Sequence, residues 1–165
     1  MVYGHTLLLL YNALIKPHFI YCITVWGNAC KTYMDKMFVT QKKIIRIITR
    51  AEFRAHTLEL FKKSNLLNIS NLHKYFVSIF VYKALHMDVP ILLGSMFTRN
   101  FNARQSANLR SVYCKKQISQ SSMKTMGPKI WNLLPVDCKN AKCLHTFRKF
   151  LKKHLHDLTY DNDNN

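Results

Sequence analysis

The chain has 165 residues and 48% apolar content, enough for one globular domain or two small ones. Only four glycines and four prolines occur, which disfavours a turn-rich all-β fold and favours helices. Lys and Arg number 25 against eight acids, a net charge of +17, and residues 1–156 alone carry +20. Self-repulsion of this size predicts a polyanionic partner, nucleic acid first and an anionic membrane second. The alternative is a drifting or fragmentary sequence that has no partner.

The apolar stretch at residues 7–26 is interrupted by Lys16-Pro17-His18. A membrane span needs about 20 uninterrupted apolar residues, so we expect a break between two helices and no membrane partner. The five cysteines are an odd number, and the N-terminus lacks the basic region and cleavage site of a signal peptide. Both features predict reduced thiols and an intracellular protein, cytoplasmic or nuclear.

In the first half of the chain, helices are predicted at residues 5–16, 17–27, 31–50 and 57–63. Pro17 should end or kink the first helix and open the second, which Gly27 ends. Thr57 is the expected N-cap of the fourth. The helix at 31–50 is amphipathic, with Met34, Met37, Phe38, Ile45 and Ile48 on one side and basic residues on another.

In the second half, residues 71–87 are apolar almost all round, which predicts a helix buried at the centre of the fold. One more helical turn is expected at 90–96. A polar basic loop follows with Arg99, Arg104 and Arg110, then short strands at 112–114 and 117–119 that would form a β-hairpin near 110–120. A last helix, 142–156, places Leu144, Phe147, Leu151, Leu155 and Leu158 on one side.

The segment GPKIWNLLP, residues 127–135, predicts a short helix with residues that mark its start and its end. Gly127 frees the entry, Pro128 suits the first helical turn, and Pro135 stops the helix one turn later. Trp131 is its only large anchor. The predicted fold is therefore mostly α: a small N-terminal helical bundle packed on a second helical layer built around residues 71–87, with a disordered tail at 159–165.

Two motifs carry a family resemblance: LYNALIKPHFIYCITVWG at residues 10–27 and GPKIWNLLP. Tyr11, Pro17, Tyr21, Trp26 and Gly27 mark the first motif. Between the two motifs lie QKKIIRIITR, Ala55-His56-Thr57 and Leu66-Leu67-Asn68-Ile69. In this order they resemble the C-terminal region of jockey-like non-LTR retrotransposon reverse transcriptases, over about residues 8–156.

The resemblance implies a helical thumb at about 1–56, which lies along the template–primer backbone, and a post-thumb region at 57–158. The palm and fingers of the parent polymerase would be missing partners. The family's Tyr-x-Asp-Asp sequence and its upstream Asp are not in this chain. We therefore expect a transposon-derived fragment of an RNA-directed DNA polymerase.

We expect no catalysis by this chain alone. Two-metal nucleotidyl transfer needs at least two converging carboxylates, and the acids of the body are scattered: Asp35, Glu52, Glu59, Asp88 and Asp137. No glycine-rich phosphate loop is present, and no nucleophile with a supporting acid accompanies His56. Cys138, Cys143 and His145, with His154 and His156 downstream, offer zinc-ligand types, but their spacing matches no common zinc finger. We predict no metal and no cofactor.

The candidate nucleic-acid-binding residues are basic and lie in two predicted helices and one loop: Lys36, Lys42, Lys43, Arg46, Arg50 and Arg54, then Arg148 and Lys152 with Lys149 and Lys153. Lys and Arg contact phosphates without reading sequence, which suits an RNA–DNA hybrid or a duplex. The alternative is a solvated helix face. Tyr11, Tyr21, Trp26 and Trp131 could stack on bases, although their neighbours favour core packing. Two other functional readings stay open, a non-functional structural fragment and a helical protein-interaction module.

Overall fold

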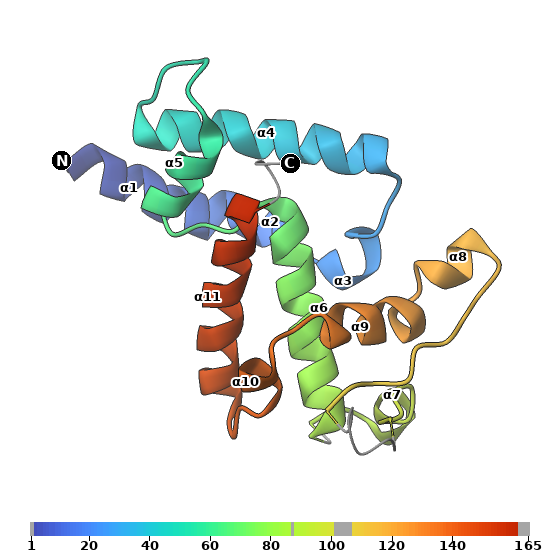
Figure 1. Cartoon of the computed structure of the whole chain (residues 1–165). Helices are drawn as coiled ribbons and strands as arrows, with labels where there is room; N and C mark the ends of the chain where they lie inside the picture. The colour runs from blue at the N-terminus through green and yellow to red at the C-terminus, as the bar shows by residue number, and fades with distance from the viewer. Residues whose placement is uncertain (1, 87, 101–106, 162–165) are drawn as a thin grey trace. The chain divides into compact units, whose positions relative to one another are not determined.

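The computed structural model describes residues 2–86, 88–100 and 107–161 (Figure 1). Helices dominate these residues, which confirms the mostly α class. In chain order the elements are α1 (Val2–Leu10), the π-helical segment η1 (Tyr11–Ile15), α2 (Lys16–Ile20), α3 (Ile23–Trp26), α4 (Lys31–Thr49), α5 (Thr57–Lys63), α6 (Ile69–Leu85), α7 (Ile91–Gly94), α8 (Gln117–Gln120), α9 (Met123–Asn132), α10 (Val136–Lys139) and α11 (Leu144–Asp161).

The chain forms two compact units. The first unit comprises Met1–His73 with Leu155–Asn165, and the second unit comprises Lys74–His154. The boundary near residue 56 that the family resemblance implies lies within the first of these units. In the structure α5 and the start of α6 stay with the first unit, since Phe61 stacks on Phe38 of α4 with ring centroids 6.4 Å apart.

The first helix does not break at Pro17, so the predicted corner at that residue is wrong. Backbone from α1 through η1 to α2 stays right-handed and helical. Here η1 is a wide turn in which the Lys16 N–H donates to the Tyr11 carbonyl, and such a turn accommodates the proline ring that follows. The chain turns instead at Cys22, whose φ is +50°. Helix α3 then ends against Gly27, as predicted.

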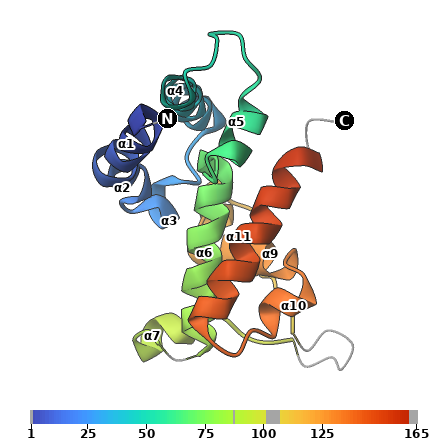
Figure 2. The ribbon, with the colours of Figure 1, turned by 90° about the vertical axis from the view of Figure 1, so that its left-hand side faces the viewer.

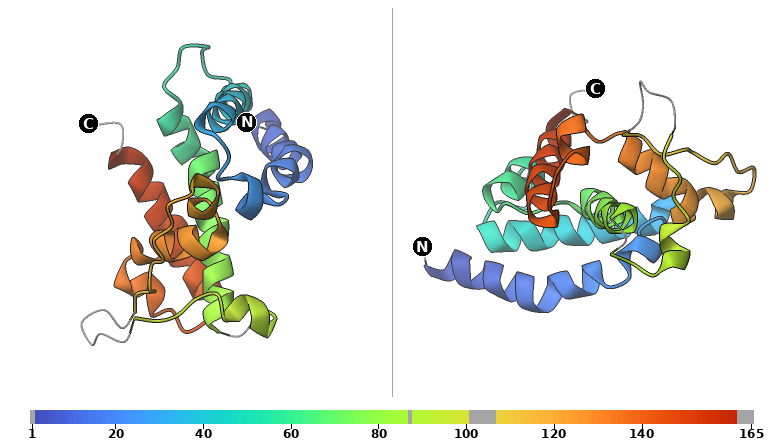
Figure 3. Two further views of the ribbon diagram at one scale, coloured as in Figure 1. Left: turned by 90° about the vertical axis from the view of Figure 1, so that its right-hand side faces the viewer. Right: turned by 90° about the horizontal axis from the view of Figure 1, so that it is seen from below.

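Helix α4 confirms the amphipathic prediction, with Ile45 and Ile48 buried on the expected side. It packs against α1 and α5, and the α1–α4 pair is visible in the right panel of Figure 3. Helix α5 also has the predicted bounds. Its N-cap residue is His56, however, and Thr57 is the buried first residue, so the N-cap prediction is wrong.

Gln41 is buried in the middle of this first unit, with only 1% of its surface exposed. Its Nε2 donates to the Leu67 carbonyl at 3.0 Å and to the Tyr11 hydroxyl at 3.3 Å. Its Oε1 accepts from the Ile69 N–H at 2.8 Å. One amide side chain thus joins η1, α4 and the start of α6. Figure 2 views α4 nearly end-on, with α1 beside it.

The second unit is built around an aromatic stack. The Tyr82 ring of α6 lies 4.4 Å from Phe147 of α11, and Phe147 lies 5.8 Å from Trp131 of α9, measured between ring centroids. The polar atoms at both ends are bonded: the Tyr82 hydroxyl donates to the Ala141 carbonyl and the Trp131 indole N–H donates to the Ala107 carbonyl. As predicted, α6 is buried on most sides, and its one exposed position between Ile69 and Leu85 is Ser70.

Helix α9 begins earlier than predicted, at Met123, so Gly127 and Pro128 lie inside it and not at its entry. A helical residue before proline normally clashes through its Cβ, and glycine removes that clash. Gly127 also lets α9 approach its neighbours, because a Cβ there would lie 2.8 Å from Cε1 of Phe97 and 3.1 Å from Cγ2 of Val81. The helix ends at Asn132, before Pro135, which is the N-cap of α10.

The β-hairpin predicted near 110–120 is wrong. Residues 112–114 are irregular, and Gln117–Gln120 is the short helix α8. Antiparallel pairing occurs earlier, where the Asn100 N–H donates to the Asn108 carbonyl and the Arg110 N–H donates to the Thr98 carbonyl. The alternation at 112–119 misled the prediction because so short a hairpin is unstable without a face to pack on.

Helix α11 places Phe147, Leu151 and Leu155 in the core, with Leu144 and Leu158 half-buried, as predicted. It continues to Asp161, beyond the predicted end at residue 156, so residues 159–161 of the predicted disordered tail are helical; the rest of that tail, 162–165, lies outside the described residues. No helix within the described ranges combines the length and apolar character that crossing a membrane requires.

Candidate nucleic-acid interface

A basic stripe occupies the outer face of α4 and the loop after it. We call it the α4 stripe: Lys36, Lys42, Lys43, Arg46, Arg50 and Arg54. Lys36 and Lys43 are seven residues apart, which aligns them along one line of α4. Arg50, seven residues further on, is the left-handed C-cap of the helix. All three residues are exposed. The buried positions Gln41, Ile45 and Ile48 lie on the other side. Asp35, near the N-terminal end, is the one acidic residue of α4.

Aromatic rings hold several of these cations. The Lys42 ammonium lies 4.3 Å from the Phe38 ring centroid, and the Lys36 ammonium lies 5.8 Å from that of Tyr33. Such contacts leave an ammonium accessible to an anion while they restrict where it points. The stripe is therefore partly ordered.

Arg46 has a structural role that the sequence did not indicate. Its Nε and Nη2 both donate to the Ala55 carbonyl at 3.2 Å, and this bidentate contact fastens the loop after α4 onto the helix. Its guanidinium carbon also lies 6.0 Å from the Phe53 ring centroid. Arg46, one of the predicted phosphate ligands, is therefore held within the protein by two hydrogen bonds.

A hollow lies where α4 ends and this loop begins. It has a volume of about 480 Å³, and its lining residues are Lys43, Arg46, Ile47, Arg50, Ala51 and Phe53. Its floor is mainly apolar and its charged lining residues are all basic. The exposed Phe53 ring at its edge was missed at the sequence level, because a single aromatic residue in a polar loop has no periodic signal.

The other predicted basic residues lie in the second unit. Arg148, Lys149 and Lys153 are exposed on α11, and Lys152 is half-buried. Burial raises the pKa of Tyr75, and the positive charge of Arg148 opposes this shift. Arg99 and Arg110 are exposed, whereas Arg104 lies outside the described residues.

A second hollow, about 370 Å³, adjoins Arg110 and Lys124. Four of its six other lining residues carry a hydroxyl group; the six are Ser95, Met96, Thr98, Ser111, Val112 and Tyr113. The Ser95 hydroxyl already donates to the Leu92 carbonyl within its own turn. The hollow is more polar than the one beside Phe53.

The aromatic residues of the two family-like motifs do not gather into a stacking surface. Tyr11 and Trp131 are buried core residues, as predicted. Trp26 is half-buried and its indole donates to the Tyr21 carbonyl at 2.6 Å. Tyr21 was expected in the core, but it is 77% exposed because the turn at Cys22 directs it outward.

The acids of the body, Asp35, Glu52, Glu59, Asp88 and Asp137, are all exposed. Among the described residues, no three His, Cys, Asp or Glu side chains lie close enough together to hold a metal ion. Of the zinc-type ligands, Cys138 is buried and Cys143 is exposed. Burial raises the pKa of the Cys138 thiol, which disfavours the thiolate that a metal requires.

Asn132 has a structural role in the second unit that the sequence did not indicate. Its Oδ1 accepts from the Leu109 N–H at 2.8 Å and its Nδ2 donates to the Leu109 carbonyl at 2.9 Å. Lys139 reinforces the same segment through Asn108. These bonds hold the chain just before Arg110 and so position the second hollow.

Comparison with known proteins identifies no relative: no family model, no curated protein and no solved structure matches this chain.

Proposed function

We propose that this chain binds the backbone of duplex nucleic acid, an RNA–DNA hybrid or DNA, through the α4 stripe and without catalysis of its own. The observation that carries the proposal is the pair of exposed residues Lys36 and Lys43 on one line of α4, with exposed Arg50 at the helix end and a single acidic residue in the helix. Like charges this close together repel one another until a polyanion neutralises them. A row of cations suits phosphates and gives no sequence readout.

The sequence resemblance agrees with this proposal. In jockey-like reverse transcriptases the corresponding region would be the thumb, which lies along the template–primer duplex. We propose that the chain is the C-terminal part of such a polymerase, with the palm and fingers as its missing partners.

Salt dependence of binding is the direct test. We expect about five phosphate contacts, so log K should fall with log[salt] with a slope of roughly −4 to −5. Fluorescence anisotropy with a labelled duplex of about 20 base pairs, titrated between about 50 and 200 mM salt, measures this slope. Folded protein that fails to bind at the low-salt end would refute the proposal.

A charge-matched pair of triple variants locates the interface. Lys36→Gln, Lys43→Gln and Arg50→Gln together should remove three contacts and bring the slope to about −2. The control, Lys115→Gln with Lys116→Gln and Lys129→Gln, removes the same charge from exposed positions of the second unit. Equal losses in the two variants would mean that net charge, and not the α4 stripe, governs binding.

A protein-interaction role is the second candidate, and one observation favours it. Exposed apolar side chains line α1 and η1: Leu9, Leu10, Leu14 and Ile15. Exposed apolar side chains in neighbouring helical turns favour a docking surface. Protein binding that excess nucleic acid does not compete away would favour this candidate. A broad thermal melt would instead favour the third reading, a marginally stable fragment.

A further inference from the structure

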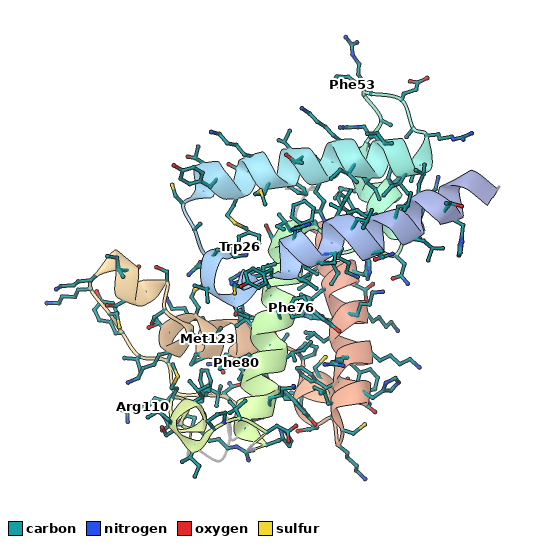
Figure 4. All side chains as sticks on the ribbon, turned by 180° about the vertical axis from the view of Figure 1, so that it is seen from behind. Trp26, Phe53, Phe76, Phe80, Arg110 and Met123 are labelled. Carbon is teal, nitrogen blue, oxygen red and sulfur yellow. The ribbon has the colours of Figure 1, made fainter. Side chains whose placement is uncertain are left out.

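The hollow at the end of α4 combines an apolar surface with basic residues. Phe53 is 80% exposed and presents its ring at the edge, as the stick view of Figure 4 shows. Ile47, also exposed, supplies an apolar wall. Lys43 and Arg50 line the same hollow from the outer face of α4. An apolar recess thus lies between two basic side chains of the kind that binds phosphates.

The Phe53 ring is held in place. The bidentate contact from Arg46 to the Ala55 carbonyl fixes the loop that carries the ring, and the Arg46 guanidinium faces the ring itself. The Arg50 N–H donates to the Ile47 carbonyl at 3.2 Å and the Ala51 N–H donates to the Arg46 carbonyl at 3.0 Å, which closes the helix end beneath the loop. A ring fixed before binding loses little freedom when a ligand stacks on it.

We infer that this hollow takes one unpaired nucleobase, stacked on Phe53, while Lys43 and Arg50 bind the phosphates on either side. The inference rests on the proposed function and gives it a second ligand class, a single-stranded end beside the duplex. Aromatic stacking tolerates every base, because each base has a π face. The cavity volume, about 480 Å³, lies in the usual range for small-molecule sites, so a single base fits.

The positive charge of the lining residues favours a nucleotide over a basic or neutral ligand. Its three charged residues are all cationic, which disfavours a basic or neutral apolar peptide. The C-terminal end of a helix disfavours anions through its dipole, and the cationic side chain of Arg50, the C-cap of α4, offsets this effect. Phosphates are expected at the Lys43 and Arg50 cations, and the uncharged base on the apolar surface between them. An acidic peptide is the competing occupant, and the test separates it.

The test compares two labelled ligands, a blunt duplex of about 20 base pairs and the same duplex with an overhang of about four nucleotides. Wild-type protein should bind the overhang form about tenfold tighter, the usual gain from one stacked base. Phe53→Ala should abolish that preference and leave blunt-duplex affinity and its salt slope unchanged, because no phosphate contact is lost. Phe53→Trp should keep the preference.

The matched control is Tyr33→Ala, which removes another exposed ring beside a cation on the same helix, away from the hollow. It should leave the overhang preference intact. Photo-crosslinking from 5-iodouracil in the overhang should label the tryptic peptide Ala51-Glu52-Phe53-Arg54, as read by mass spectrometry.

The outcomes separate the inference from the proposed function. Failure of the wild-type protein to bind either duplex refutes the proposed function. Equal binding of the two duplexes, an overhang preference that survives Phe53→Ala, or a crosslink outside residues 51–54 overturns the inference and leaves duplex binding standing. A polyglutamate peptide that displaces the overhang as well as an oligonucleotide of the same charge also overturns it, in favour of an acidic peptide.

Discussion

The two compact units fix a neighbouring segment by the same device, an amide side chain that satisfies backbone groups. Gln41 does so in the first unit, with three hydrogen bonds and 1% exposure. Asn132 does so in the second, with two bonds to Leu109 and partial exposure. Water can replace a lost partner only at the half-exposed site. The comparison teaches that burial, more than the number of bonds, sets how far each segment depends on its amide.

Replacing each of the two amide residues by alanine, in separate variants, tests this comparison most strongly. Gln41→Ala should lower the free energy of unfolding by about 2–3 kcal/mol, because it leaves the Ile69 N–H and the Leu67 carbonyl buried and unpaired. Asn132→Ala should cost about 1 kcal/mol, because water can enter the space left by this half-exposed side chain and bond the backbone N–H and carbonyl of the buried Leu109. Urea denaturation monitored by circular dichroism measures both values, with the exposed Thr40→Ala as the neutral control. A larger loss for Asn132→Ala would contradict the role given to burial.

Two helical glycines, one in each unit, should respond to alanine with opposite sign. Gly127→Ala should destabilise by about 1–2 kcal/mol, because its Cβ would overlap Phe97. Gly4→Ala in α1 should stabilise by about 0.5–1 kcal/mol, since its Cβ would meet nothing closer than the Ile48 carbonyl at 3.8 Å. Thermal melts of the two variants give the signs. Stabilisation by Gly127→Ala would show that α9 has room that the structure does not give it.

The smallest expected effect is spectroscopic, since each unit holds one tryptophan. Trp131 is buried and Trp26 is half-buried. Acrylamide should therefore quench the fluorescence of Trp131→Phe, which keeps Trp26, more strongly than that of Trp26→Phe. The Stern–Volmer constants of the two variants measure this difference, and equal constants would contradict the packing of Trp131 against Phe147.

Periodic apolar residues made α4 and α11 predictable, and a long run that is apolar almost all round made α6 predictable, because neither pattern needs knowledge of the partner. Proline misled the prediction twice. Pro17 and Pro128 read as helix boundaries, yet η1 accommodates the first and Gly127 the second. Both solutions depend on backbone geometry that no residue pattern reveals. The basic residues of the interface were identifiable by charge, whereas Phe53 and Gln41 acquire their roles only from contacts made in three dimensions.

The contact between Arg46 and Ala55 has a further consequence for any ligand of α4. Guanidinium binds phosphate bidentately through paired N–H groups, and one such pair, Nε and Nη2, already serves the Ala55 carbonyl. A phosphate that captured this pair would release the loop and, with it, the fixed position of Phe53. Phosphate capture at that edge of Arg46 and stacking on Phe53 therefore oppose each other, a negative coupling between two ligand groups a few residues apart.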